Sequence, residues 1–172
     1  MGDLTYNLAE WLRTTQLVEL ALWIGTTKFN AILVNQFWAI PVIQVIHIIA
    51  LSMATGSILM IHAKVYNMAG TGISFADTQQ RYAKVIWSSL LVLVLSGLLM
   101  IIAEPVRELI NPVFWLKMIV VILTIVLLQA YLKGLARNDT GVPVSGRGVA
   151  IVISVFWIVM IFCGRWIAYT PV

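Results

Sequence analysis

Four long stretches without a charged residue constrain most strongly what this chain can fold into. They are residues 29–63, 85–103, 118–132 and 148–164. Each reaches about twenty residues, the length of a helix that crosses a bilayer, once a terminal charge extends to the interface. The mean hydropathy of +0.97 and the charged fraction of 10% are also far from those of a water-soluble domain. The sequence therefore predicts an all-α integral membrane protein.

We expect these stretches to form a bundle of four transmembrane helices. The predicted spans are about 38–66, 82–103, 112–132 and 148–169. Glu104 and Pro105 end the second span, because the residue before a proline is disfavoured in a helix. Asn111 is a good N-cap and Pro112 suits the first helical position, so the third span begins there. Since the loops are short, consecutive helices are expected to lie antiparallel.

Residues 1–36 precede the first span, and we expect them to form an interfacial amphipathic helix. An apolar helix face opposite Glu10, Arg13 and Thr14 is typical of a helix that lies on a membrane, and here it would contain Leu8, Trp11, Leu12 and Val18. The run 17–24 is more apolar and suits partial insertion. The N-terminus lacks the pattern of a removable signal peptide, so the segment is expected to stay in the mature chain. The transmembrane domain then comprises residues 37–172.

Basic residues are unevenly distributed between the two sides of the predicted bundle. One side carries six at loop and helix-end positions, namely Lys64, Arg81, Lys84, Lys133, Arg137 and Arg147, and the other carries two, Lys28 and Arg107. The positive-inside rule places the first side in the cytoplasm and both termini outside it. The net charge of +4 is spread over the loops, so we expect contact with the lipid bilayer and not with nucleic acid.

His47 and His62 are the only histidines of the chain, and both lie in the first predicted span. Fifteen helical positions separate them by roughly 22 Å along the axis and about 60° around it. The two rings therefore face one side but lie near opposite leaflets, and they cannot bind one metal ion or one haem together. They suit two separate sites, one near each membrane surface.

The spacing of His47 and His62 resembles that on the haem-bearing helices of the cytochrome b family. There, two histidines with thirteen or fourteen residues between them, fourteen here, each ligate one haem of a transmembrane pair. The resemblance implies b-type haem and electron transfer. Two haems with two histidines each need four histidines, so either a second protomer supplies the partners, in a homo-oligomer, or a haem has one histidine, or no such pair exists.

Several residues are candidates to support a cofactor at His47. Gln44 lies on the same helix face and could fix the tautomer of the ring through a hydrogen bond. Lys117 and Arg165 are cations at the same predicted level and would suit haem propionates, and the indoles there are Trp38, Trp115 and Trp166. Alternatively, the two cations pair with Glu104 or Glu108 and the tryptophans form an interfacial belt. Ser96 is interpreted as an interhelical hydrogen-bonding residue.

Two further interpretations of His47 and His62 stay open. His47 could bind copper with nearby methionine thioethers, or it could make only a structural hydrogen bond. His62 lies near a helix end, where it is either a second ligand or an ordinary interfacial residue. The single cysteine, Cys163, excludes an internal disulfide and a cysteine-based metal site. No hydrolytic or transferase site is visible in the sequence, which leaves open whether the protein is an enzyme, and a redox role is possible.

Several motifs are similar to those of a family of bacterial inner-membrane proteins classed as a domain of unknown function. They are Phe37-Trp38-Ala39-Ile40-Pro41 with Gln44 and His47, Gly56-Ser57, the run Asn111 to Lys117, and Gly164-Arg165-Trp166-Ile167-Ala168-Tyr169. The resemblance implies a four-helix protein of the bacterial inner membrane, and it draws attention to His47, Lys117 and Arg165. His62 is not part of the pattern. This resemblance does not indicate any particular activity for the chain.

These observations lead to one main functional expectation and two alternatives. We expect a homo-oligomeric membrane protein that binds haem b through His47 near the outer surface and transfers electrons to or from an unidentified redox partner. The first alternative is a copper-handling or transport protein. The second is an accessory subunit without a cofactor.

Overall fold

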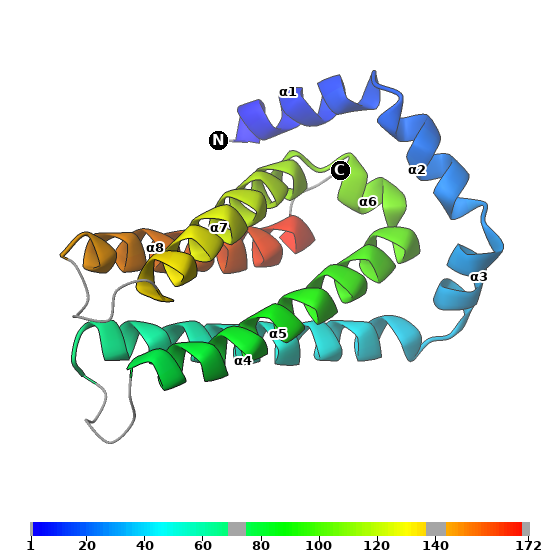
Figure 1. Cartoon of the computed structure of the whole chain (residues 1–172). Helices are drawn as coiled ribbons and strands as arrows, with labels where there is room; N and C mark the ends of the chain where they lie inside the picture. The colour runs from blue at the N-terminus through cyan, green and yellow to red at the C-terminus, as the bar shows by residue number, and fades with distance from the viewer. Residues whose placement is uncertain (1, 69–74, 137–143, 170–172) are drawn as a thin grey trace.

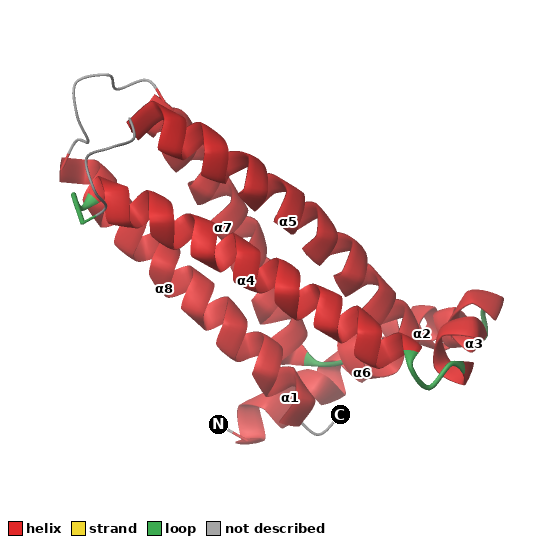
Figure 2. Cartoon of the chain, turned by 90° about the horizontal axis from the view of Figure 1, so that it is seen from below, coloured by secondary structure: helices red, strands yellow, loops and turns green. Residues whose placement is uncertain are grey.

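The computed structural model describes residues 2–68, 75–136 and 144–169. Within these ranges the chain is helical, and its longest helices are α4 (Ala39–Val65), α5 (Phe75–Ala103), α7 (Pro112–Ala136) and α8 (Val144–Trp166). They lie side by side in a bundle (Figures 1 and 2). Each is long and apolar enough to cross a membrane, which confirms the predicted all-α fold with four spans.

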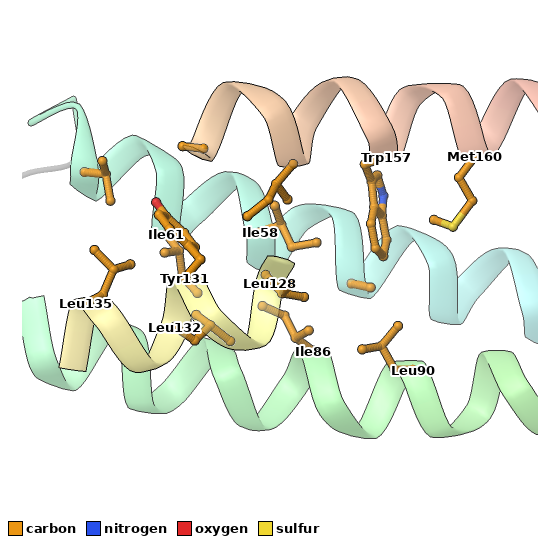
Figure 3. Close-up of a cluster of buried hydrophobic side chains, with 14 residues drawn as sticks. Ile58, Ile61, Ile86, Leu90, Leu128, Tyr131, Leu132, Leu135, Trp157 and Met160 are labelled. Atoms are coloured by element: carbon orange, nitrogen blue, oxygen red, sulfur yellow. The ribbon is translucent and has the colours of Figure 1, made fainter. Parts of the chain in front are cut away.

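The bundle is built from two helical hairpins. Helix α4 packs along α5, α7 packs along α8, and contacts between α4 and α8 and between α5 and α7 join the pairs. Each helix contributes fully buried side chains to the centre, among them Ile61, Ile86, Leu128 and Ile153. The first three are labelled in Figure 3. Large apolar side chains on the outside, such as Leu91 and Phe162, are exposed, as expected where lipid replaces water as the solvent.

A hydrogen bond between α4 and α8 joins the two hairpins. The indole nitrogen of Trp157 donates to the Thr55 hydroxyl oxygen at 2.7 Å, and that hydroxyl donates to the carbonyl oxygen of Leu51 at 2.7 Å. Figure 3 shows Trp157 projecting from α8 towards α4. Trp157 is 3% exposed, so Thr55 supplies the acceptor that its buried N–H needs.

Helix α5 begins earlier than the predicted span, which started at residue 82. Its first turns contain the polar residues 77–81, which lie outside the apolar run but continue the helix past the expected bilayer region. Gln79 in these turns donates to the carbonyl oxygen of Leu132 at 2.8 Å and so ties α5 to α7. The helix ends at Ala103, as predicted from Glu104 and Pro105, and the short helix α6 (Pro105–Leu109) follows.

The N-terminal segment forms three helices where one was expected: α1 (Gly2–Arg13), α2 (Leu17–Gly25) and α3 (Lys28–Asn35). They follow an arc around the end of the bundle at which α4 begins (Figure 1). Among residues 6–13 of α1, Ala9 and Leu12 are buried, whereas Trp11 is exposed. Helices α2 and α3 meet at a bend of 64° and are together apolar enough for a broken span or a re-entrant loop.

Asn30 fastens this arc to the bundle. Its side-chain amide donates to the carbonyl oxygens of Ile102 at 2.7 Å and of Ala103 at 3.2 Å. The last carbonyl groups of a helix have no partner within it, and Pro105 cannot continue the ladder because it has no N–H group. Asn30 therefore caps the end of α5 from a different part of the chain.

Candidate functional site

His47 makes a specific contact across the first hairpin. Its Nδ1 lies 2.8 Å from the hydroxyl oxygen of Ser96 in α5, and that oxygen lies 2.6 Å from the carbonyl oxygen of Val92. A serine hydroxyl has one hydrogen, and Val92 takes it, so the serine oxygen accepts a hydrogen bond from Nδ1–H of the ring. Nε2 of His47 then carries a lone pair, as a metal-ligating imidazole nitrogen does.

Glycines and a lysine surround this level of the bundle. A Cβ atom at Gly97 would lie 3.9 Å from Cε1 of His47, and a Cβ atom at Gly164 would lie 3.5 Å from Nζ of Lys117. Lys117 in α7 is close enough to His47 to act on it electrostatically. In the first hairpin, Gly97 lies beside the His47 ring. In the second hairpin, Gly164 lies beside the ammonium group of Lys117.

The carboxylate of Glu108 is also part of this end of the bundle. Burial raises the pKa of Glu108 above its ordinary value, and attraction to Lys117 and Arg107 offsets only part of that increase. Glu104 forms an ion pair with Arg107. The acid that acts on Lys117 is thus Glu108, one of the two partners considered from the sequence, although no salt-bridge contact between the two is found among the described residues.

Gln44 and Arg165, two other residues of the predicted site, have exposed side chains. Gln44 is exposed on α4, and Ser96 has the hydrogen-bonding role that was expected of it. Arg165 is exposed, donates to the Tyr169 hydroxyl oxygen at 2.6 Å and lies over that ring at 5.0 Å. Its guanidinium group is therefore engaged at the end of its own helix.

The three tryptophans of the predicted site are all at the bundle surface. Trp115 donates its indole N–H to the carbonyl oxygen of Leu109 at 2.9 Å, and Trp38 and Trp166 are more than half exposed. They occupy the end of the bundle at which α4 and α7 begin and α8 ends. This placement is typical of an aromatic belt at a membrane interface.

His62 repeats the arrangement of His47 near the other end of α4. Its Nδ1 lies 3.1 Å from the hydroxyl oxygen of Ser154 in α8, and Ser154 donates to the carbonyl oxygen of Ala150 at 2.9 Å. By the same reasoning Nδ1 carries the hydrogen and Nε2 the lone pair. His62 is only 6% exposed, and its Nε2 is buried without a hydrogen-bond partner. The two histidines thus bond to different helices.

The described ranges contain no group of three or more His, Cys, Asp or Glu side chains that could hold a metal ion. Cys163 is a buried free thiol. A metal ion at either histidine would therefore take most of its donors from elsewhere, for example from the four nitrogens of a porphyrin.

Sequence reasoning did not identify Ser154, Gly97 and Gly164 as part of the two histidine environments. It did treat Ser96 as an interhelical hydrogen-bonding residue, and the bond to His47 confirms this. A serine or glycine within an apolar helix is a signal of close helix packing, but it does not reveal which residue it faces. That depends on the register between helices.

Comparison with known proteins identifies a family for nearly the whole chain. Residues 10–170 match the model of DUF6644, a family of unknown function. Neither the curated proteins nor the solved structures that were compared gave a match. Because the match spans both histidines and all four long helices, the chain belongs to this family.

Proposed function

We propose that this member of the DUF6644 family is a membrane haem protein that transfers electrons and holds a b-type haem through Nε2 of His47. The observation that carries the proposal is the chain of hydrogen bonds from His47 to Ser96 and on to Val92. It leaves a lone pair on Nε2 and fixes the orientation of the ring, which are the two properties that an axial ligand needs.

The surroundings of His47 suit a flat, anionic macrocycle. Gly97 lets the His47 ring lie against the backbone of α5, and Gly164 lets the Lys117 ammonium group lie against the backbone of α8. Small residues of this kind also allow a planar group to approach a helix closely. Lys117 is the cation that would pair with a propionate, a role that also explains a lysine on an apolar helix. A haem bound there would supply one-electron redox chemistry, and burial and the axial ligand would set its potential.

The second axial ligand is proposed to come from His47 of another copy of the chain. The two histidines of one chain lie far apart on α4, so one haem cannot use both. A homo-oligomer supplies the missing nitrogen, and the expected stoichiometry is one haem for two chains. A ratio of one haem per chain would contradict this part of the proposal and leave the ligation by His47 intact.

A difference spectrum tests the haem proposal. The purified protein is expected to show Soret and α bands in its reduced-minus-oxidised spectrum, and His47→Ala is expected to lose them. Ser96→Ala should lower haem content because the ring loses its orientation. Ser88→Ala is the matched control, since Ser88 lies on the same helix, is exposed and donates to Val85 of its own helix. A wild-type protein without these bands would overturn the proposal.

Elemental analysis of the same sample separates haem binding from the alternatives. Iron accompanied by a Soret band supports the haem proposal, whereas copper without such a band would support copper handling. A colourless and metal-free protein that purifies only with a partner would be an accessory subunit.

The proposal includes an orientation in the bacterial inner membrane, with both termini outside the cytoplasm and His47 near the outer surface. The distribution of basic residues supports it, because Lys64, Lys84, Lys133 and Arg147 all belong to the end of the bundle opposite His47. Reporter fusions at the C-terminus and after residue 68 check this. Periplasmic activity is expected for the first fusion and cytoplasmic activity for the second.

A further inference from the structure

Two polar atoms of neighbouring side chains in the core have no hydrogen-bond partner. They are Nε2 of His62 in α4 and the hydroxyl oxygen of Tyr131 in α7, and each residue is 6% exposed. The two rings meet edge to face, with their centroids 5.7 Å apart. Figure 3 shows Tyr131 reaching from α7 towards α4. Two orphaned polar groups therefore lie in one small region between the hairpins.

The two groups are complementary but do not bond to each other. Nε2 of His62 is an acceptor, because Nδ1–H is used in the bond to Ser154, whereas the Tyr131 hydroxyl can donate and accept. Lipid offers no hydrogen bonds, so both groups carry the cost of burial unless a third molecule joins them. One water molecule can accept from Tyr131 and donate to His62, and so satisfies both.

Polar groups continue from this pair to the nearby end of the bundle. His62 lies one turn before the end of α4 at Val65, and Tyr66 follows as the C-cap. Tyr66 packs against the core cluster to which Tyr131 belongs, and its hydroxyl donates to the carbonyl oxygen of Arg147 at 2.8 Å. His62 therefore lies near the end of its helix, and the hydroxyl group of Tyr66 is at the same end.

We propose that His62 and Tyr131 bind a water molecule between them and that Nε2 of His62 accepts protons through it from the aqueous phase at this end. A proton arriving from bulk water adds to the bound water, which passes a proton to Nε2 and is restored to neutral water. The imidazolium keeps its Nδ1–H bond to Ser154. This inference does not depend on the haem at His47.

The side chains around His62 determine which groups could exchange a proton with it. Ser154 faces the ring from α8 and Tyr131 from α7, while α5 contributes apolar Ile86 and Leu90 to the same core. Among the residues that the structure describes, the charged side chains at this end are half-buried Lys64 and the exposed residues Asp77, Arg81, Lys84, Lys133 and Arg147. Bulk water is the proton source that the proposal invokes.

Nitrogen-15 NMR of the full chain in lipid nanodiscs, labelled at histidine only, tests the proposal. Since the chain has two histidines, His62→Gln assigns the signals by removing one set. We expect Nδ1 of His62 to be protonated, Nε2 to be unprotonated at neutral pH, and magnetisation to pass from water protons to Nε2. On acidification the His62 signals should shift to the imidazolium pattern.

Two tyrosine variants make the test specific. Tyr131→Phe removes one partner of the water and is expected to reduce the water-to-Nε2 transfer at least twofold. Tyr169→Phe is the control, because it loses the same hydroxyl group at the opposite end of the bundle, and the transfer should persist. The proposal fails if the wild type shows no transfer, if Tyr131→Phe leaves it unchanged, or if His62 stays neutral at a pH where the fold persists.

Discussion

The indole nitrogen of Trp157 lies 2.7 Å from the hydroxyl oxygen of Thr55, and this bond joins the two hairpins between the levels of the two histidines. Thr55→Val keeps the side-chain shape but leaves the buried indole N–H without an acceptor. We expect the variant to lose about 1–2 kcal/mol of stability, measured by unfolding in mixed micelles. Thr55→Ser retains the hydroxyl group and is the control. Equal stability of the two variants would show that the bond contributes little.

Asn30 should govern how firmly the N-terminal arc is held. Asn30→Leu removes the amide that caps Ile102 and Ala103, so we expect a loss of about 1 kcal/mol. Hydrogen exchange of the amides in α3 should become faster, while exchange in α4 stays unchanged. Asn35→Leu changes an exposed asparagine at the end of the same helix and should have neither effect. Equal exchange in the two variants would contradict the capping role.

Gly97 is expected to tolerate alanine but not leucine. A Cβ atom there makes an ordinary contact with the His47 ring at 3.9 Å, whereas the longer side chain occupies the space beside it. We expect Gly97→Leu to cost about 1–3 kcal/mol and to lower the content of the haem proposed at His47. Gly56→Leu is the matched control, because nothing lies within 4 Å of a Cβ atom there. The absorption spectrum and an unfolding curve of each variant provide the measurements.

Glu108 should make stability depend on pH in a defined direction. Burial raises the pKa of its carboxyl group above the ordinary value of 4.5, so the folded state binds the proton more tightly than the unfolded state does. The resulting stability is present below pH 4.5 and is lost as the pH rises through the folded pKa. We expect Glu108→Gln to remove this part of the decline. Thermal unfolding of both proteins across that range checks it, and identical slopes would exclude the effect.

The long helices were largely predictable because each depends on local sequence. The first span was predicted at 38–66 and α4 is Ala39–Val65, and the proline after Asn111 marked the start of α7 correctly. Helix α5 was predicted too short. Residues 77–81 are polar, and hydropathy detects only the apolar part of a helix, which lies within the bilayer. The breaks in the N-terminal segment were missed, since apolar runs there are too short to define helix ends.

The candidate site was only partly predictable. His47 and Lys117 were identified because titratable groups within apolar helices are unusual. The partner of His47 was expected on its own helix, at Gln44, but the structure shows Ser96 on a neighbouring one. Local periodicity predicts which residues share a face of one helix. It does not predict the register between two helices, and that register brings Ser96 to His47 and Ser154 to His62.

The two histidine–serine bonds have a mechanical consequence for α4. At one end this helix is bonded to α5 and at the other to α8, in directions about 60° apart around its axis. A rotation of α4 about that axis would strain both bonds at once, so the two bonds are coupled through the orientation of this helix. A change at His47 that rotates α4 would therefore also disturb the bond between His62 and Ser154 near the other end of the helix.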